Sequence, residues 1–371
     1  MLQDNAPQWN GLASPQLWAP LAKAEDRLAR LDETLKSSPI KDGWIARSHY
    51  QDAVASLALE GELVHLEDLV LADAEMAVRT PTHELVRAQS YLVTRRQIAN
   101  NESGWTLSRD TLNQLRNGAG EGGLEDDQEF ATADATRSSN LARRAEPAHD
   151  DTLDNAFAAI DSALANTRSA LAGEIRNRPP RDPFLYDPDR NDDDDLDLWR
   201  GQLEQTKALP PTLAAAIALD DWDTRQPLQH RPWLGRLITA AMLRQRAKTT
   251  AHLACLSVGV RAAPRRHNSM PGQIDRVIFY LHALAAAADQ GLADHSRWLT
   301  ARAGLLRKLK GRRSSSRLPD LIDLVMHRPI VSAGMVAAEL DVSTRAALDL
   351  VADLGLRETT GRGRYRAWGI L

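Results

Sequence analysis

The sequence predicts a mainly α-helical protein: a helical bundle body followed by a small winged helix-turn-helix domain at the carboxyl end. Two observations predict this fold class. Apolar residues recur at helical spacing through most of the 371 residues, of which only 5% are aromatic. Residues 320–371 then place three helices, their turns and a glycine- and arginine-rich hairpin in the order of a winged helix.

The first part of the body is expected within residues 14–116. From residue 16 to residue 36, one stripe of a helix is apolar. This stripe would pack on the body's own core or, because its spacing is close to a heptad, form a coiled-coil homodimer. Its members are Leu17, Leu21, Ala24, Leu28, Leu31 and Leu35.

Two more helices and a linker follow. A helix is expected over residues 44–59, and another begins at residues 80–82, with Pro81 in its first turn, and runs to about residue 98. Residues 117–151 are rich in glycine and in charged and small polar residues and contain few large apolar ones. We therefore expect a solvated linker there.

Helix is expected again over residues 153–176, and the prolines of residues 178–183 end it. Residues 191–195 are an acidic run. Consecutive aspartates do not converge on Ca²⁺, and the run lacks the central glycine of a calcium loop. We therefore expect a solvated loop and no metal site at this run.

The core of the body is expected within residues 152–309. Residues 203–219 and 232–246 are strongly helical and apolar, and separate helices are expected over residues 273–289 and 296–309. None of the apolar stretches is long enough to cross a bilayer, so we expect no membrane partner.

Cysteine content bears on the compartment and on cofactors. The single cysteine, Cys255, excludes a disulfide framework and a cysteine-based metal site, and its apolar surroundings predict a core position. The first twenty residues lack the basic and apolar regions of a signal peptide, so a cytoplasmic location is expected. No cofactor motif is recognised, and we expect no cofactor.

Residues 310–319 form a basic connector to the winged helix. Its first helix is expected over residues 320–327 and ends before Pro329. After a short extended stretch, Ser332 is expected to cap a second helix that continues to residue 340.

The third helix is expected over residues 344–354, with Ser343 as its amino-terminal cap and Gly355 at its end. Residues 357–368 follow as a two-stranded wing. The side of the third helix that faces the core would carry Ala347, Leu350, Val351 and Leu354. The opposite side would carry Thr344, Arg345, Leu348 and Asp349.

Charge is unevenly distributed along the chain. Residues 301–371 hold 13 lysines and arginines against seven aspartates and glutamates, a net charge of +6, whereas the whole chain carries −4. A basic arm on an acidic body is expected of a domain that faces nucleic acid, so double-stranded DNA is the expected partner. The third helix would lie in the major groove while the connector and the wing contact phosphate. The expected DNA-binding residues are Ser343, Thr344, Arg345, Arg312, Arg313, Arg317, Arg362, Arg364 and Arg366.

Two features of the third helix leave an alternative open. Asp349 and Asp353 would be costly near phosphate, so base contacts would depend mainly on Thr344 and Arg345. Winged helices also bind proteins. A protein-interaction scaffold is therefore the alternative to a DNA-binding protein.

Two segments resemble the Fic family, enzymes that transfer a nucleotidyl or similar phosphate-linked group to protein hydroxyls. Residues 44–61, which end in SLALEG, match the inhibitory helix of that family, and residues 219–238 stand where its core carries the catalytic motif. Aligning the Gly-Arg-Leu at the end of this segment places Arg236 on the second arginine of the motif. The resemblance implies an ion pair between Glu60 and Arg236 within a Fic-like body.

The sequence departs from the Fic motif at the residues that carry its chemistry. Arg225 stands where the catalytic histidine deprotonates the target hydroxyl, and arginine is not a base near neutral pH. Pro232 and Trp233 replace residues of the turn whose N–H groups bind phosphate. We therefore expect no catalytic residue and a structural role for the Glu60–Arg236 pair. An atypical Fic-like transferase is the enzyme alternative.

The domain order also resembles a family of bacterial proteins in which an α-helical domain of unknown function precedes a helix-turn-helix domain. Residues 39–44 (PIKDGW), 60–68 (EGELVHLED) and 231–236 (RPWLGR) are typical of it. This resemblance implies the domain order but no activity. The sequence predicts a DNA-binding regulator of transcription whose body serves dimerisation or binds a partner or effector.

Overall fold

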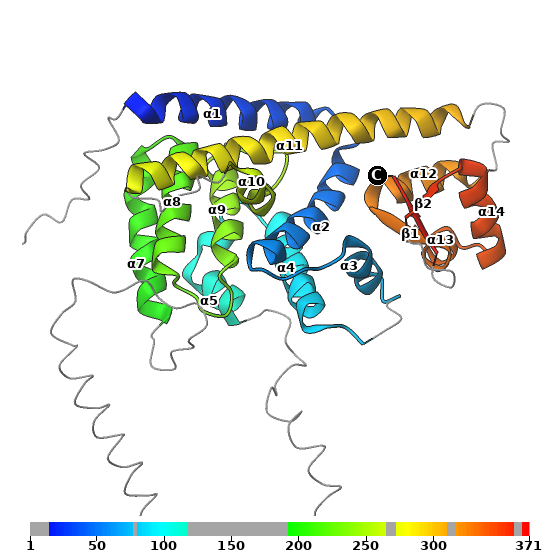
Figure 1. Ribbon diagram of the computed structural model, residues 1–371, viewed down its shortest axis with the longest axis horizontal. Coiled ribbons are helices and arrows are strands. Elements are labelled where there is room, and N and C mark those ends of the chain that lie inside the picture. Colours follow the sequence, from blue (N-terminus) through cyan, green and yellow to red (C-terminus); the bar gives the residue numbers. More distant parts are fainter. Residues whose placement is uncertain are drawn as a thin grey trace, which may run out of the picture. The chain divides into compact units, whose positions relative to one another are not determined.

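The computed structural model describes residues 15–76, 80–117, 192–264, 272–309, 316–359 and 366–370. Most of these residues are helical, and the strands form one small sheet near the carboxyl end (Figure 1). The predicted fold class, mainly α with a small carboxyl-terminal helix-turn-helix domain, is confirmed. The body contains α1 (Pro15–Lys36), α2 (Lys41–Leu59), α3 (Leu66–Asp73), α4 (His83–Asn100), η1 (Trp105–Leu107), α5 (Arg109–Asn117), α7 (Asp192–Gln205), η3 (Thr206–Ala208), α8 (Pro211–Arg225), α9 (Leu234–Gln245), α10 (Leu256–Ala262) and α11 (Gln273–Arg307).

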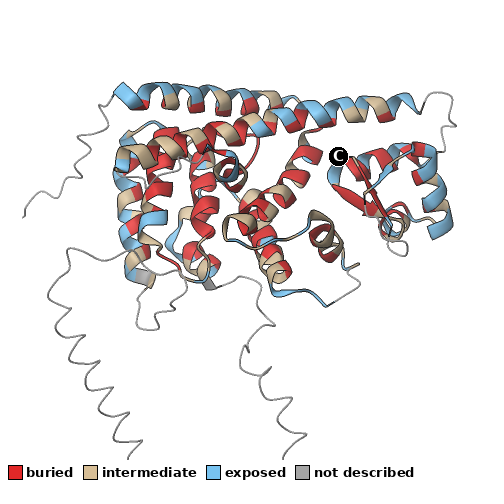
Figure 2. Cartoon of the chain, viewed as in Figure 1, coloured by how far each residue is buried: buried red, intermediate tan, exposed pale blue. Residues whose placement is uncertain are grey.

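Helix α1 lies side by side with α11 (Figure 1). All six members of its predicted apolar stripe are buried, and the stripe faces the body (Figure 2). The expectation that the stripe packs on the body's own core is therefore confirmed. A coiled-coil dimer through α1 would need the same face, which is already covered.

Helix α11 runs without interruption for 35 residues, so the prediction of two separate helices there was wrong. Gly291 lies in the middle of it and contacts α1 and α2: a methyl group at this position would lie 2.7 Å from Leu31 Cδ2. The indole N–H of Trp44 donates a 3.0 Å hydrogen bond to the Gly291 carbonyl. These tertiary contacts offset the low helix propensity of glycine.

Thr82 is the amino-terminal cap of α4, and its hydroxyl accepts a hydrogen bond of 3.4 Å from the Leu85 N–H. Pro81 therefore lies before the cap and not in the first turn, contrary to the prediction. The cap explains the difference, because Thr82 is extended and the helix begins only at His83.

The acidic run at residues 191–195 is also corrected. From Asp192 onward it forms the first turn of α7, where carboxylates interact favourably with the helix dipole. The helix expected over residues 203–219 is interrupted by η3 and by Leu209, which is extended because it precedes Pro210. Helix α8 then begins at Pro211, which needs no N–H partner in the first turn.

Helices α8 and α9 pack closely because Gly235 of α9 faces the ring of Trp222. A methyl group at Gly235 would lie 2.2 Å from Trp222 Cδ2. The Trp222 indole N–H donates to the Pro232 carbonyl at 2.7 Å. The rings of Trp199 and Trp222 pack edge to face, with 5.0 Å between their centroids. Glycine is needed here to let the two helices approach.

A buried polar network lies between α2, α4 and α10. The guanidinium of Arg95 donates to the Asp52 carboxylate at 2.9 Å and to the Leu253 carbonyl at 2.8 Å. The Tyr91 hydroxyl donates to the same carboxylate at 2.6 Å. Burial raises the pKa of the Cys255 thiol to about 12, so this cysteine is a core residue and not a nucleophile near neutral pH.

Some of the predicted elements involve residues that the structure does not describe. Apart from Asn117, which ends α5, the expected linker at residues 117–151 lies outside the described residues. So do the helix at 153–176 and its end at 178–183. In the part of the chain that the structure describes, no helix combines the length and apolarity that a membrane crossing requires.

Candidate nucleic-acid interface

The carboxyl-terminal arm folds as three helices and a three-stranded antiparallel sheet. Its helices begin and end within two residues of the predicted positions, and the predicted short extended stretch is a strand. In chain order the elements are α12 (Leu318–His327), β1 (Ile330–Ser332), α13 (Ala333–Leu340), α14 (Thr344–Leu354), β2 (Arg357–Glu358) and β3 (Ala367–Gly369).

Local caps determine where these helices begin and end. The Ser332 hydroxyl accepts a hydrogen bond of 3.2 Å from the Met335 N–H, and the Ser343 hydroxyl accepts one of 3.2 Å from the Ala346 N–H. Gly355 ends α14 with a φ of 59°, in the left-handed region that favours glycine. Sequence signals of this kind act over three or four residues, which is why the prediction succeeded here.

The sheet joins the wing to the helices. Strand β3 lies between β1 and β2, and Trp368 of β3 is paired with Val331 of β1 and Glu358 of β2. The core beneath the sheet is apolar and buried. Its members include Leu321, Val325, Val331, Val336, Leu340, Ala347, Val351, Leu354 and Trp368.

Helix α14 presents one face outward. Ala347, Val351 and Leu354 are buried while Thr344 and Arg345 are exposed, as the predicted stripe requires. Leu348 is 40% exposed, and Asp349 also lies on the outer face. Helix α14 packs against α13 and α12, and the Lys308 ammonium donates to the Leu354 carbonyl at its carboxyl end (2.6 Å). Its amino-terminal half is therefore accessible among the described residues.

The predicted DNA-binding arginines differ in what they contact. Arg345 is exposed and makes no ion pair with another described residue. Arg317 pairs with Asp320 at 3.0 Å, and Arg366 pairs with Glu358 at 2.6 Å and lies over the Trp368 ring. Both pairs are on the surface, where water screens an ion pair and its net contribution is small, so phosphate could displace either carboxylate.

Four of the predicted DNA-binding residues, Arg312, Arg313, Arg362 and Arg364, lie outside the described residues. Ser343 and Thr344 are exposed at the start of α14, where the Ser343 hydroxyl caps the helix. The prediction omitted Arg357, which is exposed on β2. Its position at the beginning of the expected wing was the signal that could have identified it.

Arg47 of α2 connects the body to the winged helix, and nothing in the sequence indicated this. Its guanidinium donates to the carbonyls of Val325 (2.7 Å), Arg328 (3.2 Å) and Ile370 (2.6 Å). It also lies over the ring of Trp298 on α11. Burial lowers the pKa of Arg47 to about 10, so the group stays charged at neutral pH.

The structure brings the predicted Glu60–Arg236 pair together. Arg236 Nη2 lies 3.2 Å from Glu60 Oε1 and donates to the Ser56 hydroxyl at 2.9 Å. Arg87 of α4 forms a second ion pair with Glu60. Burial, together with the nearby charge of Glu62, raises the pKa of Glu60, although Arg236 and Arg87 act to lower it.

Two further residues of the segment aligned with the Fic motif already have partners of their own. Arg225, at the position aligned with the Fic histidine, forms an ion pair with Asp221 at 2.8 Å. Trp233 is 2% exposed and packs against the Tyr91 ring. Within the described ranges, no group of three or more histidine, cysteine, aspartate or glutamate side chains could hold a metal ion.

Two family models and one full-length relative match this chain. Residues 184–310 match a family model described as a protein of unknown function (DUF1612), and residues 318–371 match one described as an HTH DNA binding domain. The chain is similar to uncharacterized protein y4cF of Sinorhizobium fredii (strain NBRC 101917 / NGR234). The two are 43% identical over 97% of this chain and 98% of the relative. The chain therefore belongs to the family of y4cF, and its own matches place a DUF1612 domain before a helix-turn-helix DNA-binding domain.

Proposed function

We propose that this protein is a sequence-specific DNA-binding regulator of transcription. One observation carries the proposal: the amino-terminal half of α14, with exposed Thr344 and Arg345, is the outer face of a winged helix. The match of residues 318–371 to a helix-turn-helix DNA-binding domain supports it. Because such a regulator must have access to the DNA, the proposal agrees with the expected cytoplasmic location.

The arrangement suggests a role for each side chain. With α14 in the major groove, Thr344 and Arg345 contact base edges, because an arginine can donate two hydrogen bonds to guanine. Arg317 and Arg366 contact phosphate on either side. Arg312, Arg313, Arg362 and Arg364 are proposed to contact phosphate from their positions in the sequence, and the Ser343 N–H or hydroxyl from the start of α14.

The two carboxylates of α14 define the direction of approach. Asp349 and Asp353 are exposed further along the helix and would repel phosphate. The helix is therefore expected to enter the groove with its amino-terminal end first, so that Arg345 lies deeper than either aspartate.

Mobility shifts with fragments selected from genomic DNA test this proposal. Arg345→Ala is expected to weaken binding to a selected site by about ten- to a hundredfold, because one base-contacting arginine contributes about 1–3 kcal/mol. Arg366→Ala should weaken binding to all sequences alike and reduce its dependence on salt. Arg30→Ala, an exposed arginine on α1, is the control and should bind normally. Unchanged binding by Arg345→Ala would contradict the proposed base contact, whereas the absence of a shifted complex with any selected fragment would favour the protein-interaction scaffold.

We further propose that the body is a Fic-like bundle without transferase activity, in which the Glu60–Arg236 pair is structural. Three observations support the proposal: the short distance between Glu60 and Arg236, the ion pair of Arg225 with Asp221, and the burial of Trp233. Incubation with labelled ATP tests it, with Glu60→Gly included to remove the presumed inhibition. Neither form is expected to become labelled, and labelling of Glu60→Gly alone would favour an atypical transferase.

A further inference from the structure

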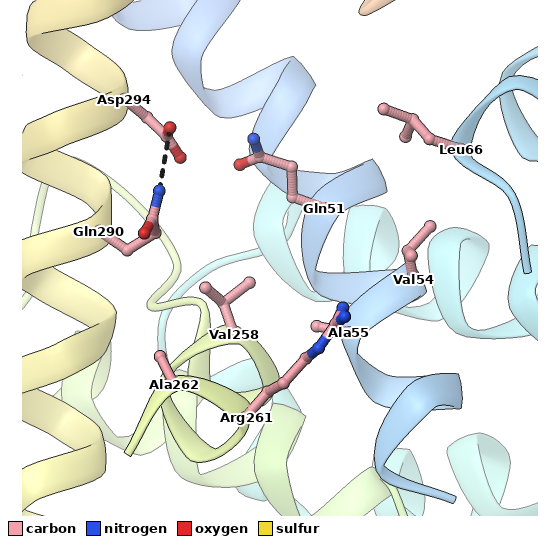
Figure 3. Close-up of a pocket in the computed structure, with 9 residues that line it drawn as sticks. All are labelled: Gln51, Val54, Ala55, Leu66, Val258, Arg261, Ala262, Gln290 and Asp294. Atoms are coloured by element: carbon pink, nitrogen blue, oxygen red, sulfur yellow. Dashed lines mark hydrogen bonds between the residues drawn. The ribbon is translucent and has the colours of Figure 1, made fainter. Parts of the chain in front are cut away.

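A pocket of about 390 Å³ lies in the body, lined by side chains of α2, α3, α10 and α11 (Figure 3). The larger apolar side chains that line it are Val54, Leu66 and Val258. Such a volume and lining are typical of sites for small molecules, which combine apolar walls with a few polar groups that orient the ligand. The pocket is separate from the Glu60–Arg236 pair, which does not line it.

Polar groups lie at two places in this pocket. The Gln290 amide donates to Asp294 at 3.2 Å, and the carboxylate of Asp294 also forms an ion pair with Arg297 at 2.6 Å. This part of the wall is therefore close to neutral. Arg261 extends from α10 toward Ala55 of α2, as Figure 3 shows. It is exposed and makes no ion pair with another described residue.

We propose that this pocket binds a small organic anion with an apolar body. Its carboxylate contacts the Arg261 guanidinium, which offers donors in the fork geometry that suits a carboxylate. Its apolar body packs against Val54, Leu66 and Val258. A neutral molecule of the same shape loses the contact with Arg261 and binds more weakly.

The pocket is connected to the DNA-binding domain through two of the helices that line it. On α2, Arg47 lies one turn before Gln51 and donates to carbonyls of the winged helix. On α11, the chain continues past Asp294 to Lys308, which donates to the Leu354 carbonyl at the end of α14. A ligand that changes the spacing of α2 and α11 therefore alters the presentation of α14. This regulatory step rests on the proposed DNA-binding function, whereas ligand binding itself does not.

Titration of the full chain with octanoate, and with octanamide as the uncharged control, tests the binding site by calorimetry without DNA. Octanoate is expected to bind about tenfold or more tightly than octanamide, a difference of roughly 1.4 kcal/mol. Arg261→Gln should remove this preference, and Ala262→Trp should block the pocket. Both residues are exposed, so neither change threatens the fold. Arg30→Gln is the matched surface control.

The outcomes are distinct. No octanoate binding at millimolar concentration, or equal binding by wild type, Arg261→Gln and Ala262→Trp, overturns the site. For regulation, octanoate should change the affinity of the wild type for its selected DNA at least about threefold, and Lys308→Met should reduce that change while it retains octanoate binding. If octanoate binds but DNA affinity does not respond, the regulatory step is overturned. If the protein binds no DNA, the proposed function fails while the calorimetry still decides the site.

Discussion

Glu60 ends α2 and contacts arginines from two other helices, Arg87 of α4 and Arg236 of α9. The Glu60 side chain is 14% exposed and that of Arg236 10%, so water screens the pair only weakly. Removing one member of such a cluster leaves the charge of the other uncompensated in a poorly solvated place. A single carboxylate therefore connects three helices of the body.

Glu60→Gln is expected to lower the free energy of unfolding by about 3 kcal/mol, the lower end for breaking a buried pair from one side, because the amide keeps some hydrogen bonds. Urea unfolding measures it. Asp26→Asn is the control: its partner, Arg30, lies on the exposed face of α1, and the expected cost is about 0.5 kcal/mol or less. Equal effects of the two substitutions would contradict a structural role for the Glu60 pair.

At the scale of elements, close approach of helices depends on small residues at particular positions. Gly235 brings α9 against Trp222 of α8, and Gly291 brings α11 against Leu31 of α1. Gly201 of α7 differs, because a methyl group there would meet no atom within 4 Å. The same residue type thus has opposite consequences in helices of one bundle.

Gly235→Ala is expected to destabilise the protein by about 3 kcal/mol, the upper end for overpacking a core, since the added methyl group meets the rigid Trp222 ring. Gly201→Ala should instead stabilise it by about 0.5–1 kcal/mol through helix propensity. Thermal and urea unfolding of both variants would check the contrast. A neutral Gly235→Ala would mean that α8 and α9 pack less closely than described.

At the scale of the whole molecule, buried histidines couple stability to pH. Burial, with a smaller contribution from Arg95 and Arg96, lowers the pKa of His49 to about 2, and burial also lowers the pKa of His252. An unfolded histidine has a pKa of about 6.5. Between these values the unfolded chain binds a proton that the folded chain does not, so stability falls as the pH falls below about 6.5.

Lowering the pH from 7 to 5.5 is therefore expected to reduce the free energy of unfolding by about 1 kcal/mol for His49, and His252 acts in the same direction. In His49→Phe the slope of stability against pH should be smaller by about this amount over that interval. His327→Ala, an exposed residue of α12, should keep the wild-type slope. Buried carboxylates with raised pKa values contribute equally to all three proteins, so the comparison isolates His49. Identical slopes in wild type and His49→Phe would refute this account.

The sequence by itself determined the order of the elements in the winged helix, the buried face of α1 and α14, and the caps at Ser332 and Ser343. These features depend on spacing and on hydrogen bonds between residues three or four apart. The sequence also showed that the carboxyl-terminal arm is basic, and it placed Arg345 on the outer face of α14.

Only the tertiary structure decided that α11 is continuous through Gly291, that Arg47 donates to the winged helix, and that a pocket lies beside Arg261. Each of these depends on residues brought together from distant parts of the chain. The contacts of Gly291 with α1 and α2 outweigh its weak helix propensity, and no local pattern encodes which carbonyls a buried arginine will meet.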